Sequence, residues 1–230
     1  MNWDVLLFLI FPYVALVLAV VVTSYRMIHR PFTVSSLSSQ LLERKKLYWG
    51  SIPFHWGVVI ILLAHLLALL IPEAVIWWNA VPVRLYLLEG TGAILGIWAL
   101  AGLVILCYRR LDSSRVRAVT TPMDLVILLL LLIQLLSGVL IATSFRFGSY
   151  WGAAVLTPYL RSLLTLRPRP ELVADLAWVL KLHVAGFFVL LVVFPFSRLV
   201  HLITVPLGYL FRPWQIVIWI RKRRPQRGRI

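Results

Sequence analysis

Long apolar blocks without a charge, separated by charged loops, dominate the hydropathy pattern of this chain. Four of them lie at residues 5–25, 47–72, 90–108 and 125–145. Each has about the 20 residues that a helix needs to cross the hydrocarbon of a bilayer. A fifth block, interrupted by Arg198, is interpreted as a span over about 176–205, with the arginine snorkelling toward the headgroups. The pattern therefore predicts an all-α polytopic membrane protein with five transmembrane helices.

The basic residues are distributed unevenly between the loops. Loops 26–50, 109–123 and 206–230 hold 16 Lys and Arg, whereas loops 73–89 and 144–175 hold 5. The positive-inside rule then predicts an N-terminus outside and a C-terminus in the cytoplasm. We expect a membrane domain over 1–205 and a basic cytoplasmic tail over 206–230. Anionic lipid or an acidic partner surface, rather than nucleic acid, accounts for the net charge of +15.

Two loops carry local structural signals. The apolar stretch 150–166 is broken by Pro158 and Arg161, so it predicts a short helix lying at the interface rather than a span. Thr120, Thr121 and Pro122 ahead of Asp124 are typical of a helix start.

Four histidines lie inside the apolar blocks, His55 and His65 in the second and His183 and His201 in the fifth. Ionisable groups at membrane depth are costly and usually functional. Because the two helices run antiparallel, His55 is expected at the depth of His201, and His65 at the depth of His183. One such histidine alone would favour a packing role, but four that are paired in depth indicate two metal sites with two histidines each.

The spacings agree only in part with this pairing. Ten residues separate His55 from His65, a rise of about 15 Å, and 18 residues separate His183 from His201, a rise of about 27 Å. Eighteen residues are five full turns, so we expect the latter two on one helix face. Helix tilt and a kink at Pro195 would absorb part of the difference in rise.

Histidine pairs suit haem iron and leave no open position for oxygen chemistry, which favours electron transfer. The single cysteine, Cys107, and the lack of a Cys-x-x-Cys-His run exclude covalent c-type haem, so we expect two haem b groups. Zinc is the rival metal that these histidines could bind, but no carboxylate or cysteine lies near them in sequence. Arginines that could pair with haem propionates, or could simply flank the membrane, are Arg109 and Arg198, followed by Arg110, Arg115 and Arg117.

Several segments resemble the gamma subunit of the membrane-bound respiratory nitrate reductases, a dihaem cytochrome b. The matching segments are residues 39–45, 54–57, 64–65, 115–118, 182–183 and 194–201. The most specific is Phe-Pro-Phe-Ser-Arg-Leu over 194–199, shortly before His201 in the last span.

The resemblance implies that the four histidines bind two b haems in the pairing given above. It also implies a protein of the cytoplasmic membrane that oxidises quinol near the outer haem and releases the protons outside. Electrons would pass to an iron–sulfur beta subunit and a molybdenum alpha subunit in the cytoplasm. The family associates a lysine of the loop after the second helix with quinol; the nearest basic residue here is Arg84, which could instead only snorkel at the interface.

Three alternatives remain open at this stage. Similar dihaem subunits occur in heterodisulfide reductases and sulfite-reduction complexes, with another cytoplasmic partner. A proton transporter using a histidine relay should show acidic residues within the spans, where only Asp124 at a helix end is expected. A plain membrane anchor would need no buried histidine.

Overall fold

The computed structural model describes residues 3–30, 42–145 and 147–203, and this part of the chain contains helices and no strand. Five helical segments are long and apolar enough to cross a membrane: Trp3–His29, Lys45–Leu70, Pro82–Asp112, Pro122–Ser144 and Trp178–Phe196. The expected all-α polytopic fold with five spans is therefore confirmed. The basic tail 206–230 lies outside the described residues.

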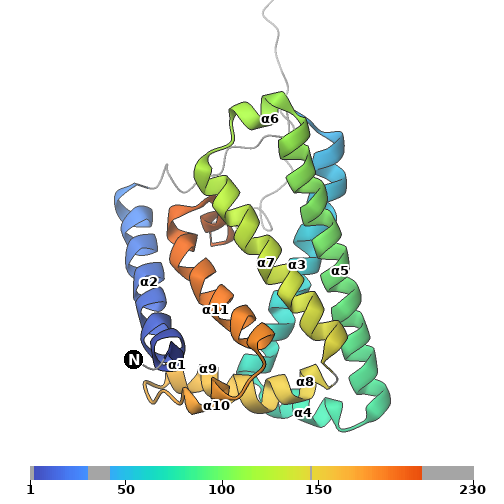
Figure 1. Cartoon of the computed structure of the whole chain (residues 1–230), viewed down its shortest axis with the longest axis vertical. Helices are drawn as coiled ribbons and strands as arrows, with labels where there is room; N and C mark the ends of the chain where they lie inside the picture. The colour runs from blue at the N-terminus through green and yellow to red at the C-terminus, as the bar shows by residue number, and fades with distance from the viewer. Residues whose placement is uncertain (1–2, 31–41, 146, 204–230) are drawn as a thin grey trace, which may run out of the picture.

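The long helices stand side by side and short helices lie across their ends (Figure 1). The order is α1 (Trp3–Val5), a π-helical turn (Leu6–Ile10), α2 (Phe11–His29), α3 (Lys45–Leu70), α4 (Pro72–Asn79), α5 (Pro82–Asp112), α6 (Ser114–Ala118), α7 (Pro122–Ser144), α8 (Gly148–Trp151), η3 (Gly152–Leu156), α9 (Thr157–Leu164), α10 (Glu171–Ala174), α11 (Trp178–Val193), and the 3-10 turns η4 (Phe194–Phe196) and η5 (Arg198–Leu202). We call the two ends of the bundle the α6 end and the α9 end. The stretch from α8 to α9 lies across the α9 end of the bundle, in agreement with the short, non-spanning helix that the sequence predicted over 150–166.

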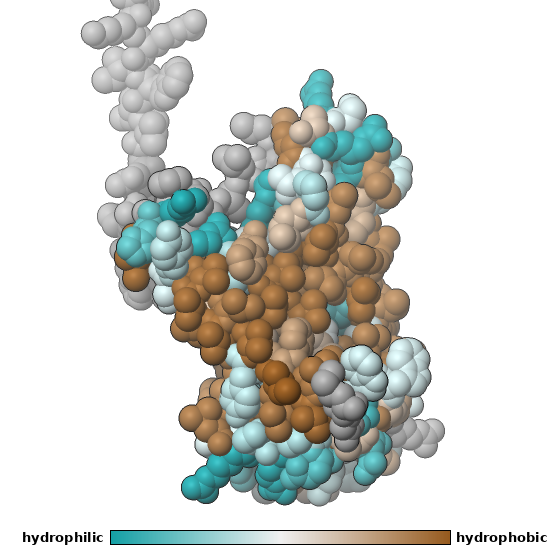
Figure 2. Space-filling model, turned by 60° about the vertical axis from the view of Figure 1, so that its left-hand side comes forward, coloured by the Kyte–Doolittle hydropathy of each residue, from teal (hydrophilic) through white to brown (hydrophobic). Residues whose placement is uncertain are grey.

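The outer surface fits a bilayer. Figure 2 shows a band of hydrophobic side chains between two hydrophilic ends. Leucine, valine, isoleucine and tryptophan side chains along α3 and α5 are exposed, including Trp49, Trp56 and Leu63. Large apolar side chains at such positions are stable only against lipid or another apolar surface.

Helix α3 packs against α5 through a seam of small residues. A Cβ atom added at Gly102 would lie 2.6 Å from the Phe54 nitrogen and 2.7 Å from the Gly50 carbonyl oxygen. At Gly57 it would lie 2.8 Å from the Ala99 Cβ. Glycine and alanine let helix backbones approach closely in a membrane. From this seam the packing continues from α5 to α7, from α7 to α11 and from α11 to α2.

The α9 end is closed by a small core. Tyr159 of α9 is fully buried, meets Phe8 edge-on at 6.4 Å between ring centroids, and donates its hydroxyl to the Phe8 carbonyl at 2.9 Å. Arg161 donates to the carbonyls of Leu69 and Leu70 at the last turn of α3, at 2.9 and 2.7 Å. The bonds from Arg161 satisfy carbonyls that the end of α3 leaves without an intrahelical donor. Together with the bond to Phe8, they fix α9 to α3 and to the π-helical turn that precedes α2.

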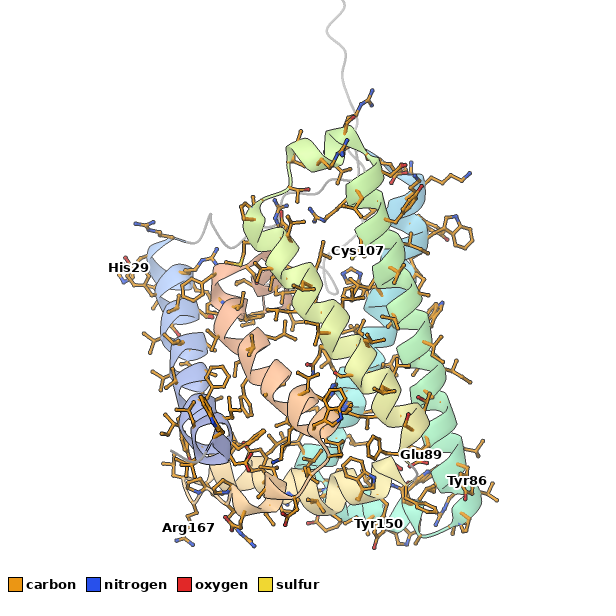
Figure 3. All side chains as sticks on the ribbon, in the orientation of Figure 1. His29, Tyr86, Glu89, Cys107, Tyr150 and Arg167 are labelled. Atoms are coloured by element: carbon orange, nitrogen blue, oxygen red, sulfur yellow. The ribbon has the colours of Figure 1, made fainter. Side chains whose placement is uncertain are left out.

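Helix α5 begins earlier than the apolar block suggested. It starts at Pro82 instead of residue 90, so Glu89 lies within the spanning helix. The Glu89 carboxylate accepts hydrogen bonds from the N–H and the hydroxyl of Ser149, at 3.1 and 3.3 Å, beside α8 (Figure 3). The expectation that Asp124 is the only acidic residue within the spans was therefore wrong. Because these donors satisfy the carboxylate, the helix can include it near the end of the bundle.

The sequence predicted a fifth span over about 176–205, but the structure does not form one continuous helix there. Helix α11 ends at Val193, and Pro195, which has no N–H to donate, lies in the 3-10 turn that follows. Ser197 is extended, and its hydroxyl accepts the Leu199 N–H to begin η5, which carries His201. The argument that five full turns align His183 with His201 is therefore wrong, because the helix is broken between them.

Candidate functional site

The rings of His55 and His201 lie together in the half of the bundle toward the α6 end. His55 is on α3, and His201 is on η5, which the break after α11 turns toward α3. Their ring centroids are 6.3 Å apart, with an angle of 60° between the ring planes. Two residues 146 positions apart in sequence are thus brought close together.

This separation suits a shared metal ion. Imidazole nitrogens bind first-row metals at about 2 Å, so two rings on opposite sides of one ion have centroids roughly 6 Å apart. The observed 6.3 Å agrees with that geometry. Two neutral nitrogen donors on opposite sides are also the donor set that haem iron accepts.

His65 and His183, the second predicted pair, both lie closer to the α9 end. His65 lies five residues before the end of α3, and His183 lies in the second turn of α11. Within residues 3–30, 42–145 and 147–203, no three histidine, cysteine or acidic side chains are grouped closely enough to hold a metal ion.

All four imidazoles have their Nδ1 atom in a hydrogen bond. The partners are the carbonyl of Ser51 for His55 (2.8 Å), of Ile61 for His65 (2.8 Å) and of Arg198 for His201 (2.7 Å), and the Ser137 hydroxyl for His183 (2.9 Å). A carbonyl only accepts, so the proton must lie on Nδ1 in the three rings that it holds. Their Nε2 atoms then keep the lone pair that a metal needs.

The space around the rings also suits a large flat group. His55 and His65 are exposed, so protein side chains do not cover them. A Cβ added at Gly138 of α7 would lie 3.1 Å from Cε1 of His183, so glycine is the residue that lets α7 pass this close to the ring. The donor chemistry therefore suits a haem at each pair. Exposure leaves room beside His55 and His65, whereas at His183 the Gln134 side chain, whose Nε2 lies 3.3 Å from the ring Nε2, would have to move aside.

Arg109, a predicted propionate partner, is almost fully buried and pairs with Glu43. Its Nε lies 2.8 Å from Glu43 Oε2, and it also donates to the Glu43 carbonyl at 2.9 Å. The same carboxylate accepts the N–H groups of Lys46 and Leu47 at the start of α3. Burial acts to raise the pKa of Glu43, but the hydrogen bonds from Lys46, Arg109 and Leu47 outweigh it and hold this pKa below its ordinary value.

Arg198, the other predicted propionate partner, pairs with a buried carboxylate. Asp124 Oδ1 lies 3.0 Å from Arg198 Nε, and Asp124 Oδ2 lies 3.6 Å from Arg110. Asp124 also forms the capping box of α7 with Thr121, which confirms the predicted helix start. Since the Arg198 carbonyl holds His201, this ion-pair cluster connects α5 and α7 to the turn that carries the histidine. Arg115 and Arg117 are exposed on α6.

Arg84, the predicted quinol contact, lies at the α9 end, at the start of α5. Its guanidinium stacks on two indoles, 4.6 Å from the Trp77 ring and 5.3 Å from the Trp78 ring, and donates to the Trp77 carbonyl at 3.3 Å. The Trp78 indole N–H donates back to the Arg84 carbonyl at 3.2 Å. Arg84 Nε is buried and has no hydrogen-bond acceptor among the described residues.

Four residues around the histidines were missed by sequence reasoning: Asp124, Ser137, Gln134 and Ser51, whose hydroxyl lies 3.1 Å from His55 Nδ1. Asp124 was read only as a helix start, and Ser137 and Gln134 were not considered. Ser137 and Gln134 are three residues apart on α7 and meet His183 only through the packing of α7 on α11. No sequence signal links them to His183, which is more than 40 positions away. The contact of Ser51 with His55 could have been predicted, because residues four apart on a helix are neighbours.

Comparisons with known proteins match nearly the whole chain. Residues 4–220 match the family model described as nitrate reductase gamma subunit. The chain is 37% identical to the nitrate reductase gamma chain of Bacillus subtilis (strain 168) over 211 residues, covering 90% of this chain and 94% of the relative. It is 34% identical to the respiratory nitrate reductase 1 gamma chain of Escherichia coli (strain K12), covering 90% and 94%. A more distant match, 25% identical over 70% of this chain and 48% of the relative, is the Hdr-like menaquinol oxidoreductase cytochrome b-like subunit of Archaeoglobus profundus.

Proposed function

The chain belongs to the nitrate reductase gamma subunit family, and on that premise we propose that it is the quinol-oxidising, dihaem subunit of the complex. Relatives that it matches over nearly their whole length are gamma chains of nitrate reductases, so the chain is a membrane subunit of an oxidoreductase. In the proposal it lies in the cytoplasmic membrane. It delivers electrons to an iron–sulfur beta subunit and a molybdenum alpha subunit.

The observation that carries the proposal is the approach of two membrane-depth histidines from different segments, His55 and His201. His55 and His201, at 6.3 Å between ring centroids, would hold one haem b, and His65 with His183 would hold the other. Haem in both positions supplies one-electron transfer between the two sides of the bilayer. The hydrogen bond at each Nδ1 keeps the ligand ring oriented and its Nε2 free of a proton.

The α6 end is the proposed cytoplasmic side. Arg109, Arg110, Arg115 and Arg117 lie there, as the positive-inside rule requires of short cytoplasmic loops. The exposed arginines of α6 would meet the cytoplasmic subunits or anionic headgroups. Arg109 pairs with Glu43, and Arg198 pairs with Asp124. A haem propionate that approached either arginine would therefore share that arginine with a protein carboxylate.

The α9 end is the proposed quinol side, with Arg84 as a contact. Trp77 and Trp78 hold the guanidinium in place, and its buried Nε has an N–H that needs an acceptor. A quinol or quinone oxygen is an acceptor of the right kind, and unsatisfied buried donors are costly. His65 and His183 lie toward the same end of the bundle.

The test is a two-step reduction of the purified complex without oxygen. Adding a quinol should produce the absorbance bands of reduced b haem, and subsequent nitrate should abolish them. A haem that dithionite reduces but quinol does not would contradict the quinol role. Reoxidation by another terminal acceptor but not by nitrate would contradict the assignment to nitrate reduction.

A second candidate is the dihaem subunit of a heterodisulfide-reductase-like complex. It is favoured by the similarity to the Hdr-like menaquinol oxidoreductase subunit, at lower identity and coverage than the nitrate reductase chains. The histidine geometry would serve both. The reoxidation step above separates them, because only the terminal acceptor differs.

A further inference from the structure

His183 differs from the other three candidate ligands in what holds its ring. His55, His65 and His201 each direct Nδ1 to a backbone carbonyl three or four residues earlier in their own segment, and His55 Nδ1 also lies 3.1 Å from the hydroxyl of Ser51 on its own helix. His183 directs Nδ1 to the hydroxyl of Ser137, on the neighbouring helix α7, at 2.9 Å. The orientation of this one ring therefore depends on a side chain from another helix.

The hydroxyl of Ser137 has one direction left for the imidazole. Ser137 is buried, and its oxygen lies 3.0 Å from the Gln134 carbonyl, which can only accept a hydrogen bond. The hydroxyl proton is used there, so the serine oxygen must accept from His183. The proton of this imidazole is thereby placed on Nδ1, and the lone pair on Nε2.

Gln134 and Gly138 lie at other edges of the same ring, and Gly186 lies beside the Gln134 side chain. Gln134 Nε2 lies 3.1 Å from the His183 carbonyl and 3.3 Å from its Nε2, while Gln134 Oε1 is buried without a donor among the described residues. A Cβ at Gly186 would lie 2.5 Å from Gln134 Oε1, and one at Gly138 would lie 3.1 Å from the ring. The pocket thus fits this ring closely, with Ser137 at Nδ1.

We propose that Ser137 is a positioning residue for His183: its hydroxyl fixes the Nδ1–H tautomer and thereby sets the strength of His183 as an iron ligand. The inference rests on the proposed binding of haem by the His65–His183 pair. An acceptor at Nδ1 makes an imidazole a stronger donor to metal, which stabilises ferric over ferrous iron. Because Ser137 contacts only His183 among the four candidate ligands, substituting it should change the midpoint potential of this haem alone.

The experiment uses the full complex carrying Ser137→Ala, with Ser137→Thr as the variant that keeps the hydroxyl. Redox titration of the b-haem absorbance should show one midpoint potential raised in Ser137→Ala and the other unchanged, and Ser137→Thr should return the shifted value toward the parent. Loss of a partner to a metal-bound histidine typically weakens metal binding roughly 10- to 100-fold, so the same haem should also dissociate first on dilution in detergent. Thr143→Val is the matched control, because this α7 hydroxyl bonds only to its own helix carbonyls in the described contacts.

Two results would overturn the inference: a Ser137→Ala titration identical to the parent, or an equal shift of both haems. Failure of the underlying function looks different. If His183→Ala retains both haems, the ligand assignment itself is wrong. If His183→Ala loses one haem while Ser137→Ala leaves both potentials unchanged, only the role of Ser137 fails.

Discussion

The two histidine pairs are built from different kinds of support. In the pair near the α6 end, His55 stands on a regular helix, whereas His201 stands on a 3-10 turn that follows a helix break. Ion pairs connect that turn to α5 and α7: Asp124 of α7 pairs both with Arg198 of the turn and with Arg110 of α5. In the pair near the α9 end both histidines lie on regular helices, and the second is held by a hydroxyl from α7.

This contrast shows which parts of the chain control each pair. Helix α3 and its glycine seam with α5 are common to both, because His55 and His65 share one helix. The ion-pair cluster supports only His201, and Ser137 touches only His183. Substitutions should therefore separate into those that disturb both pairs and those that disturb one.

Removing a ligand should have the largest effect. We expect His55→Ala and His65→Ala each to lower the haem content from two per chain to one, because a single remaining imidazole holds haem weakly. The pyridine hemochrome assay measures the content. His29→Ala is the control, since His29 stacks on Tyr25 at 4.8 Å at the end of α2; a loss of haem there, or none at residues 55 and 65, would refute the pairing.

Gly102→Ala should disturb both pairs together. The new Cβ would lie 2.6 Å from a backbone nitrogen of α3, so helix α3 must move, at a cost in the upper part of the roughly 1–3 kcal/mol range for overpacking. Thermal unfolding in detergent, followed by haem release, should show both haems lost at a lower temperature. Gly92→Ala makes the same substitution in the same helix where no atom lies within 4 Å, and it should leave the transition unchanged.

Arg84→Ala should act at the α9 end alone. Loss of a hydrogen bond from a charged donor costs about 1.5–3 kcal/mol, so haem reduction by quinol should slow roughly 10- to 100-fold while haem content stays at two. Stopped-flow absorbance measures the rate. Arg167→Ala, an exposed arginine at the same end (Figure 3), should behave as the parent. An unchanged rate in Arg84→Ala would remove this residue from the quinol site.

Asp124→Asn should act on the His55–His201 pair alone. It removes the carboxylate that faces Arg110 and Arg198, at a cost of roughly 1–3 kcal/mol, below that of a fully buried pair because Arg198 is partly exposed. The haem of this pair should then be released before the other on heating, as resolved by redox titration of partly heated samples. Asp112→Asn breaks the exposed pair with Lys46 and should change neither haem.

Acidification should have the smallest effect, through Glu43. Its pKa is lower in the folded protein than in the unfolded chain, so its ionisation stabilises the fold above the unfolded pKa of about 4.3. That contribution is lost as the pH falls through the lower, folded pKa. Unfolding temperatures measured between pH 7 and pH 3 should therefore fall less in Glu43→Gln than in the parent. Parallel curves for the two proteins would contradict the role given to the Glu43–Arg109 contact.

The sequence predicted the features that depend on local pattern. Span number follows from apolar length, the α7 start from Thr121, Pro122 and Asp124, and the meeting of His55 with His201 from antiparallel direction. It failed where tertiary contacts or local breaks decide. Glu89 is accommodated in α5 by Ser149, more than 50 residues away, and α11 ends at Val193, before the turn that contains Pro195, where hydropathy would continue the helix.

The central claim is that four histidines hold two non-covalent haems. The most direct measurement is the haem stoichiometry of the unmodified chain, from its reduced-minus-oxidised spectrum and its pyridine hemochrome. The account predicts b-type bands, two haems per chain and two one-electron components in a redox titration. A colourless protein, or one with a single haem per chain, would contradict it.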